Sequence, residues 1–520
     1  MGFYDAIKNE LNNETKLTEN GAVAYRTSGK KLLDLNFAVA SLRRASETEI
    51  INKFMDAYWE NPIAAIKWLF YNRDCREGLG ERRSFRIILK YLAQNKPEVI
   101  RAVFDLTPEY GRFDDLWCLL DTELKHDIIC LIAEQLEVDK AYMENGKSCS
   151  LIAKWLPSLN CSSNETKRYA NIICKGLEMT PREYRKMLSA MRKYIDVVEC
   201  KMSAKEWGAI NYETVPSRAN LIYNNAFLRN DEERRRAYLG TLERGEAKIN
   251  ASTLFPHDIV HKYGLGFGRG VDATLEGLWK ALPDTVKGCG NTIVVADGSG
   301  SMTCCKVGGN TGVTALDVAN SLAIYFAERS SGEFKDKYIT FSERPQLVDF
   351  SNAKNLRDKL MIARQHNEVA NTNIEAVFDL ILSTAIKNRM TQEDIPANIL
   401  ICSDMEFDSC ATSGEAPTRN GWGWGYSTYN RPTTTLFNTI AKKYEAHGYK
   451  LPRLIFWNVN SRTGTIPVRE NDLGVALVSG FSVNIVNMVM SNKLDPYECL
   501  LDVLNTERYQ SIEDAIKDII

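Results

Sequence analysis

The sequence predicts a two-part chain, an all-helical part followed by an α/β part. From residue 31 to residue 287, helical patterns follow one another and no convincing strand separates them. From residue 288 onward, short apolar runs rich in Val and Ile alternate with helical patterns. This alternation is typical of an open, mostly parallel sheet covered by helices. The predicted fold class is therefore α plus α/β.

The helical part begins after residues 1–30, which are polar, contain turn formers and are expected to be a loosely held arm. Prolines at 62, 97 and 181 stand where helices should start, because proline is tolerated in the first turn of a helix. Helices are predicted over residues 47–60, 62–72, 84–94, 97–106, 113–120, 124–136 and 181–194. Such a succession predicts a helical-repeat array, although the sequence has no clean period.

Strands of the α/β part are predicted over residues 292–296, 337–341, 346–350, 398–403, 453–458 and 475–478. The first leads into Asp297-Gly-Ser299-Gly-Ser301, a turn with one carboxylate and two hydroxyls at alternating positions. These are hard oxygen ligands, and the glycines allow the backbone to fold them around one point. A second apolar strand ends at Asp404. Because open parallel sheets bind ligands beyond the carboxyl ends of their strands, a metal site is expected there.

The composition excludes several classes of protein. With 520 residues, 44% hydrophobic and 25% charged residues and a net charge of -2, the chain has the profile of a soluble globular protein. Residues 1–20 are polar and no apolar run reaches about 18 residues, so neither a signal peptide nor a membrane span is expected. The 13 cysteines form no CxxC pair, which argues against a zinc cluster or disulfide framework and favours the cytoplasm.

The turn at Asp297, Ser299 and Ser301 resembles the metal-ion-dependent adhesion site of von Willebrand factor A (vWA) domains. The motif of that family continues with a Thr and then with an Asp after a later strand, and Thr372 and Asp404 match these positions. The resemblance implies that these five residues hold Mg²⁺ or Mn²⁺, with one position open for a carboxylate of a partner. The alternative is a vWA-like fold in which the hydroxyls only cap the turn and the helix.

A second resemblance concerns residues 72–83, Asn-Arg-Asp-Cys-Arg-Glu-Gly-Leu-Gly-Glu-Arg-Arg. The Ro ribonucleoprotein family has a turn of this type in its TROVE module, which a vWA domain follows. Residues 154–158, 211–219 and 256–260 are more similar to a branch with the same two parts, found in plants, fungi, bacteria and viruses. The resemblance implies a HEAT-like ring or arc over residues 31–287, a vWA domain over 288–520, and binding of RNA.

Residues 151–250 hold 18 basic and 12 acidic side chains, which could form the basic stripe that RNA binding needs. The candidate RNA contacts are Arg73, Arg76, Arg82, Arg83, Lys167, Arg168, Arg182, Arg185, Lys186, Arg192 and Lys193. Two alternatives stay open. The arginines of the turn could form a salt-bridged connection with Asp74, Glu77 and Glu81, and the stripe could be the solvated face of amphipathic helices.

A long segment after Asp404, residues 409–432, contains Trp422, Trp424 and Tyr426 among glycines. Loops of this length are often functional, and exposed aromatic residues are favoured in protein interfaces. These three residues are candidates for contacts with a protein partner. The alternative is a loop that folds over its own domain.

The sequence therefore favours a non-enzymatic RNA-binding scaffold of a Ro-like ribonucleoprotein, with a divalent-metal vWA site for a protein partner. The alternative is a protein–protein adaptor whose metal site captures a carboxylate and which has no role with RNA. A hydrolase is not expected, because no catalytic constellation is evident beside the ligating acids.

Overall fold

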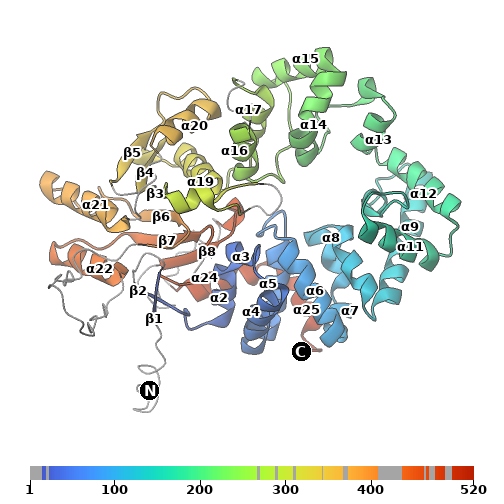
Figure 1. Cartoon of the computed structure of the whole chain (residues 1–520), viewed down its shortest axis with the longest axis horizontal. Coiled ribbons are helices and arrows are strands. Elements are labelled where there is room, and N and C mark those ends of the chain that lie inside the picture. Colours follow the sequence, from blue (N-terminus) through green and yellow to red (C-terminus); the bar gives the residue numbers. More distant parts are fainter. Residues whose placement is uncertain are drawn as a thin grey trace, which may run out of the picture. The chain divides into compact units, whose positions relative to one another are not determined.

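A computed structural model of the chain describes residues 15–18, 23–265, 270–286, 291–307, 312–341, 344–366, 373–407, 436–461, 464–467, 475–485 and 495–520. The chain divides into two compact units (Figure 1). The sheet unit comprises Met1–Ser46, Phe255–Val271 and Asp284–Val503, and the helical unit comprises Glu47–Leu254, Asp272–Pro283 and Leu504–Ile520. Each unit is thus built from three separate pieces of the sequence.

The sheet unit contains a six-stranded sheet in the order β5-β4-β3-β6-β7-β8. Its strands are β3 (Thr292–Asp297), β4 (Lys337–Phe341), β5 (Gln346–Asp349), β6 (Asn398–Ser403), β7 (Arg453–Asn458) and β8 (Val475–Ser479). All neighbours are parallel except β4 and β5, which are antiparallel. The first strand of the sheet in sequence, β3, lies in the middle, and the later strands are added first on one side of it and then on the other. This is the strand order of a doubly wound sheet, here with the antiparallel strand β5 at one edge. The predicted α/β part and its six strands are confirmed.

Helices cover this sheet. The helices of the unit are α2 (Lys31–Phe37), α3 (Val39–Leu42), α16 (Pro256–Leu265), α18 (Gly300–Cys304), α19 (Ala315–Arg329), α20 (Leu356–Gln365), α21 (Ile374–Asn388), α22 (Leu436–Ala446) and α24 (Pro496–Leu504). Helix α19 lies along the sheet in Figure 1 and packs against β3, β4 and β6. It is buried over most of its length, and Thr314 and Asp317 form a capping box that fixes its start.

The N-terminal residues that the structure describes belong to the sheet unit, which differs from the loosely held arm expected over 1–30. Strands β1 (Thr15–Leu17) and β2 (Val23–Tyr25) form an antiparallel pair. The Thr18 hydroxyl donates a hydrogen bond to the carbonyl oxygen of Phe407 at 2.6 Å, and Tyr25 pairs with Ile466. Hydrogen bonds from a hydroxyl or from the backbone do not depend on apolar side chains, so a polar sequence can still be held in place.

The helical unit consists of α-helices and short 3₁₀ helices. They are α4 (Glu47–Glu60), α5 (Pro62–Arg73), α6 (Arg83–Asn95), α7 (Pro97–Arg101), η1 (Phe104–Leu106), α8 (Thr107–Tyr110), η2 (Phe113–Asp121), α9 (Lys125–Glu144), α10 (Ile152–Trp155), α11 (Asn164–Gly176), α12 (Pro181–Tyr194), α13 (Val198–Ser203), η3 (Trp207–Ala209), α14 (Ser217–Asn230), α15 (Glu232–Glu243), α17 (Ala273–Lys280), η8 (Glu507–Tyr509) and α25 (Gln510–Ile516). Helices adjacent in sequence pack on one another, as in a helical-repeat array. The predicted helical part is confirmed, whereas a ring or an arc stays a prediction.

Two predicted helices differ in detail. The segment expected as one helix over 97–106 is α7 followed by η1, and 113–120 is a 3₁₀ helix. In η2 the side chain of Asp115 accepts a hydrogen bond from the Arg112 backbone N–H at 3.0 Å. Asp115 is also bound by arginine side chains, so its position is determined by tertiary contacts that periodicity does not report.

The C-terminal segment 504–520 packs within the helical unit, which differs from the predicted vWA domain over 288–520. Asp74, which is fully buried, accepts hydrogen bonds from the guanidinium of Arg508, with Nη2 to Oδ1 at 2.9 Å, and from the Tyr509 hydroxyl at 3.1 Å. Tyr509 stacks on Tyr110 with ring centroids 5.7 Å apart. Arg508 lies 434 residues after Asp74, so no local pattern could place it there.

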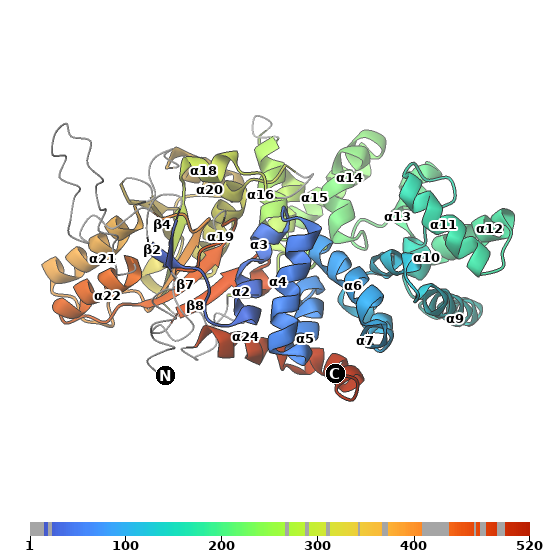
Figure 2. The same ribbon diagram turned by 60° about the horizontal axis from the view of Figure 1, so that its bottom comes forward.

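Helix α25 packs against α5, as Figure 2 shows near the C-terminus. Lys67 of α5 is 1% exposed, and its Nζ lies 2.6 Å from Glu513 Oε2 and 2.8 Å from Asn505 Oδ1. A buried ammonium is tolerated only when it is paired in this way. Two buried charges of the helical unit, Lys67 and Asp74, therefore find their partners in the last residues of the chain.

Within the described ranges, no helix combines the length and the apolar character needed to cross a membrane.

We predict that Arg508→Gln destabilises the helical unit, because it leaves the fully buried Asp74 carboxylate without its guanidinium partner. Loss of one partner of a buried pair typically costs about 3–5 kcal/mol of the free energy of unfolding. Urea unfolding followed by far-UV circular dichroism measures the change. Lys517→Gln is the control, because Lys517 pairs with Asp514 on the surface of the same segment and its loss should change little. Equal midpoints for the two variants would contradict the prediction.

Candidate metal centre at the carboxyl ends of two central strands

The order of strands places a reversal between β3 and β6. From β3 the chain adds β4 and β5 on one side, and β6, β7 and β8 follow on the other side. Strands β3 and β6 are parallel neighbours, with Ala296 opposite Cys402. Asp297 therefore ends β3 beside Ser403, which ends β6, and Asp404 follows directly. In open α/β sheets, ligands bind in the crevice beyond such a reversal.

Asp297 and Asp404 are both buried at this edge, with exposed fractions of 1% and 0%. Asp297 Oδ1 accepts a hydrogen bond from the Ser299 backbone N–H at 2.9 Å, and its Oδ2 accepts one from the Ser403 hydroxyl at 2.7 Å. Burial, and then the charge of Asp404, raise the pKa of Asp297 to about 7, although the hydrogen bonds from Ser299 and Ser403 act to lower it. The two carboxylates thus disfavour each other's charge, a conflict that a bound cation would remove.

The hydroxyls of the turn are not used as helix caps. Ser299 occupies the N-cap position of α18, yet its side chain makes no capping hydrogen bond. Its Oγ lies 3.0 Å from the Oγ of Ser301, so the two hydroxyls face each other. This geometry argues against the alternative in which the hydroxyls only cap the helix. Four of the five predicted metal-site residues are thus described, and Thr372 lies outside the described residues.

The donor set fits a hard divalent cation. Two carboxylates and two hydroxyls are oxygen ligands of the kind that Mg²⁺ and Mn²⁺ prefer over soft ligands. Over the described ranges, no three His, Cys, Asp or Glu side chains gather as metal ligands. A site here must therefore rely on the hydroxyls of Ser299 and Ser301 and on Asp297 and Asp404.

Two further polar residues belong to this edge. Glu406, an acid that the sequence places two residues after Asp404 and that was expected near the ion or on its approach, is fully buried. Met405, between the two acids, has φ of 64°, a left-handed conformation that is uncommon for a residue with a side chain. Ser403, which binds Asp297 as described above, was not assigned from sequence. A hydroxyl at the end of an apolar strand is the sequence signal that would have found it. The aromatic candidates Trp422, Trp424 and Tyr426 lie outside the described residues.

The arginine-rich turn around residues 72–83 is held by internal ion pairs. Asp115 is fully buried, and its carboxylate meets Arg73 at 2.7 Å, Arg86 at 2.7 Å and Arg82 at 3.3 Å. Burial alone would raise the pKa of Asp115, but these three guanidinium groups outweigh it and hold the pKa below its usual range. Gly111 packs against this pair so closely that a Cβ there would lie 2.6 Å from an Asp115 oxygen.

This arrangement corrects the prediction of Arg73 as an RNA contact, because Arg73 is only 3% exposed. Arg82 also pairs with Asp114, and Arg76 donates a hydrogen bond to the carbonyl oxygen of Glu109. Arg83 is exposed. The salt-bridged connection expected as the alternative is therefore present, with Asp114 and Asp115 binding the arginines, while Asp74 binds Arg508.

The candidate RNA contacts on α11 and α12 differ in their exposure and in what they already bind. Arg192 is a structural residue, because it donates to the carbonyl oxygens of Ala153 and Leu156 and to the Ser158 hydroxyl at 2.6–3.0 Å. Arg168 is half exposed and forms a bidentate pair with Asp121. Lys167 is partly exposed. The basic residues that α12 exposes to solvent are Arg182, Arg185, Lys186 and Lys193.

The chain is similar to two families of unknown function. Residues 291–516 match the family described as Domain of unknown function (DUF7788). Residues 18–106 and 175–291 match the family described as Domain of unknown function (DUF2828). The candidate metal residues lie in the first match, and α12 lies in the second.

Two individual proteins are also similar to the chain. The uncharacterized protein L728 of Acanthamoeba polyphaga mimivirus is 29% identical over 527 residues, which cover 94% of this chain and 86% of that protein. The crystal structure of the Deinococcus radiodurans Ro (RSR) protein covers 86% of this chain and 93% of that chain, at 14% identity and a TM-score of 0.41. A likeness at that level supports no inference about function.

We predict that Asp115→Asn destabilises the helical unit near neutral pH and flattens its acid sensitivity. The folded-state pKa of Asp115 lies below its ordinary value of 3.8, so its stabilising contribution is complete above that pH and is lost as the pH falls through the folded-state pKa. The variant leaves Arg73 buried without its partner, which should cost about 3–5 kcal/mol at pH 7.

Urea unfolding at pH 7 and at about pH 3 measures both effects, and wild type should lose more stability between these values than the variant. Asp127→Asn is the control, because Asp127 forms a partly exposed pair with Arg101. A variant that loses as much stability as wild type on acidification would show that Asp115 does not carry this dependence.

Proposed function

We propose that the chain is a divalent-cation-dependent binding protein. In this proposal Asp297, Ser299, Ser301 and Asp404 hold Mg²⁺ or Mn²⁺ at the carboxyl ends of β3 and β6. Thr372 is the predicted fifth ligand. The bound ion would supply a Lewis-acidic position for a carboxylate of a partner protein, since Mg²⁺ accepts exchangeable oxygen ligands.

One observation carries the proposal. Two carboxylates are buried together at the reversal of the strand order, and next to them the hydroxyls of Ser299 and Ser301 face each other while Ser299 makes no capping hydrogen bond to the helix. Burying like charges is unfavourable unless something compensates for them. A divalent cation compensates for both carboxylates at once and uses the hydroxyls as further donors. The role proposed is binding, and no reaction is assigned to the site.

The test measures thermal unfolding with and without Mg²⁺. Mg²⁺ should raise the stability of wild type, by about 2.7 kcal/mol at 100 times its Kd, because it binds only the folded state. Asp297→Asn should abolish this gain. In EDTA the variant should be no less stable than wild type, because it removes one of two like charges and its Oδ1 can still accept the Ser299 N–H.

Asp349→Asn is the matched control. Asp349 also accepts a backbone N–H two residues on, from Ser351 at 2.8 Å, but it is exposed at the edge strand β5. This variant should keep the full response to Mg²⁺. Equal gains from Mg²⁺ in wild type and Asp297→Asn would overturn the metal site.

Binding of RNA by the helical unit is the second candidate function. The observation that favours it is the exposed face of α12, where Arg182, Arg185, Lys186 and Lys193 form no ion pair with the described residues. Unpaired cations along one helix suit the phosphate backbone, whose neutralisation provides most non-specific affinity. In a Ro-like scaffold, this face and the metal site would serve two different partners.

We predict that reversing the charge of Arg182, Arg185 and Lys186 to Glu weakens binding of a structured RNA with a single-stranded tail. The dependence of log K on log salt should become less steep, by about 0.7 for each phosphate of a single strand that the variant no longer neutralises. Filter binding at several salt concentrations measures both changes.

The control carries the same change of charge on Lys140, Arg236 and Arg244, which are exposed in the same unit but paired with Glu137, Glu232 and Glu246. This triple variant should bind the RNA with almost the affinity of wild type. If both triple variants bind equally, the effect is one of overall charge, and α12 is not the RNA-binding face.

A further inference from the structure

A fully buried arginine stands out in the helical unit. The side chain of Arg235 on α15 is 0% exposed, and it forms no ion pair with any described carboxylate. Its guanidinium donates to neutral acceptors, the amide oxygens of Asn220 and Asn224 and the Thr274 hydroxyl, at 3.1–3.5 Å. Burial lowers the pKa of Arg235, although Tyr238, Tyr212 and Asp272 act to raise it. Such a charge is costly and needs a compensating partner.

Aromatic rings enclose the same guanidinium. Its carbon atom lies 4.8 Å from the ring centroid of Tyr212, 5.2 Å from that of Phe227 and 5.3 Å from that of Tyr238. Tyr212 and Tyr238 are themselves neighbours, with centroids 5.5 Å apart. Because Tyr238 is partly exposed and Arg235 is not, the cation lies on the interior side of these rings. Its field therefore acts on whatever contacts their outer side.

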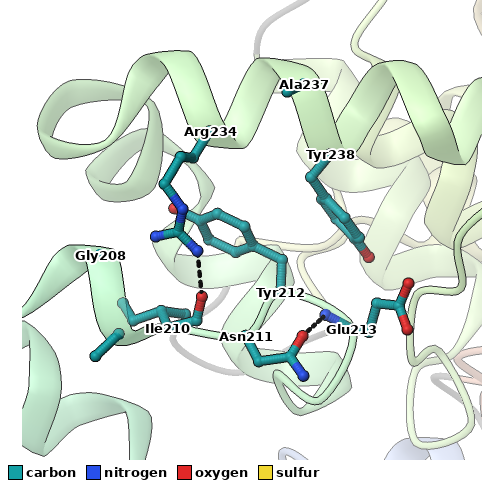
Figure 3. Close-up of a pocket in the computed structure, with 9 residues that line it drawn as sticks. Gly208, Ile210, Asn211, Tyr212, Glu213, Arg234, Ala237 and Tyr238 are labelled. Atoms are coloured by element: carbon teal, nitrogen blue, oxygen red, sulfur yellow. Dashed lines mark hydrogen bonds between the residues drawn. The ribbon is translucent and has the colours of Figure 1, made fainter.

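Tyr212 and Tyr238 also line a hollow of about 560 Å³, whereas Arg235 does not line it. Figure 3 shows Arg234 and Tyr238 projecting from α15 toward the loop of residues 208–213, which carries Tyr212, and Ala237 on the helix between them. The volume falls within the range of pockets that hold small molecules, about 300–1,000 Å³. The loop is fixed by the hollow's own residues, since Arg234 donates to the carbonyl oxygens of Trp207 and Ile210 at 3.0 and 2.9 Å.

Arg234 places hydrogen-bond donors of a guanidinium at the rim. Its side chain is 45% exposed, and it pairs with Asp231 at 2.8 Å through Nη1. Asp231 also accepts the Tyr212 hydroxyl at 2.7 Å. The Nε–H of Arg234 has no acceptor among the described residues, so the exposed edge of the guanidinium can still bind an oxygen anion. Glu213 is the one carboxylate that lines the hollow, and it is exposed to solvent.

We infer that this hollow binds a small planar ring that carries an anionic group, with the ring against Tyr238 and the anion at Arg234. The tyrosine rings already contact the Arg235 cation, so they attract a second cation poorly. Aromatic cages usually bind cations, and we expect this hollow to prefer anions instead. A planar ring can stack on tyrosine in the offset or tilted arrangements that aromatic pairs prefer. A carboxylate or a phosphate matches the planar donors of arginine.

Isothermal titration calorimetry of the full chain tests the inference with four probes. Adenosine 5′-monophosphate and salicylate each carry a ring and an anion, whereas adenosine lacks the anion and inorganic phosphate lacks the ring. Both ring-bearing anions should bind more tightly than the controls. Adenosine bound as tightly as its monophosphate would overturn the anion requirement.

Variants locate the site. Ala237→Phe should abolish binding by filling the hollow, because Ala237 is an exposed lining residue without a role in the charged contacts. Arg234→Ala should weaken binding of the anions by about tenfold or more, and it should weaken binding of adenosine less, because adenosine loses only the support that Arg234 gives the loop. Arg236→Ala is the control, since Arg236 lies on the same helix, is 69% exposed and pairs with Glu232. It should bind as wild type does.

The inference fails if no ring-bearing anion shows saturable binding, or if Ala237→Phe binds as tightly as wild type. It also fails if Arg234→Ala and Arg236→Ala weaken binding equally, because the effect would then come from overall charge. Circular dichroism of each variant shows whether it is folded, and a loss of binding counts only for folded protein. Ala237→Phe is the safer variant in this respect, because it removes no ion pair.

Discussion

Carboxylates that have been removed from water require compensation, and the two units of this chain meet that requirement differently. In the helical unit, Asp115 is surrounded by three arginines and Asp74 is bound by Arg508. In the sheet unit, Asp297 has another carboxylate, Asp404, as its neighbour, and its hydrogen bonds come from neutral groups. In the first arrangement the negative charges are balanced by arginines of the same chain, and these ion pairs stabilise the helical unit. The second brings two like charges close together in a buried place, which is why we propose a bound cation there.

Arginine has three distinct uses in the helical unit, and composition does not distinguish them. Arg73 and Arg192 bind acceptors inside the unit, the Asp115 carboxylate and the Ala153 carbonyl oxygen, respectively. Arg235 is a buried charge enclosed by aromatic rings. Arg182 and Arg185 are exposed on α12. Their local sequences are equally basic, so the difference arises from whether a distant acid or carbonyl group reaches the guanidinium. Counts of basic residues therefore overstate the surface available to RNA.

The sequence was sufficient for the parts of the structure that depend on local pattern. Apolar runs ending in an acid predicted β3 and β6, and with them the positions of Asp297 and Asp404 at one edge of the sheet. It could not predict which unit a segment joins. Arg508 meets Asp74 across 434 residues, and neither side chain differs locally from an ordinary surface residue. The same limit applies to Asp115, whose arginines come from the end of α5, from α6 and from the turn between them.

The packing of residues 504–520 within the helical unit bears on the order in which the protein is made. A ribosome synthesises Lys67 and Asp74 more than 400 residues before it synthesises their partners Glu513 and Arg508. The helical unit therefore keeps two unmatched charges until residues 504–520 have been made, whereas most domains fold as units while the chain grows. A stop codon introduced just before residue 504 would remove no residue of 47–254, yet it would destabilise the fold of that segment.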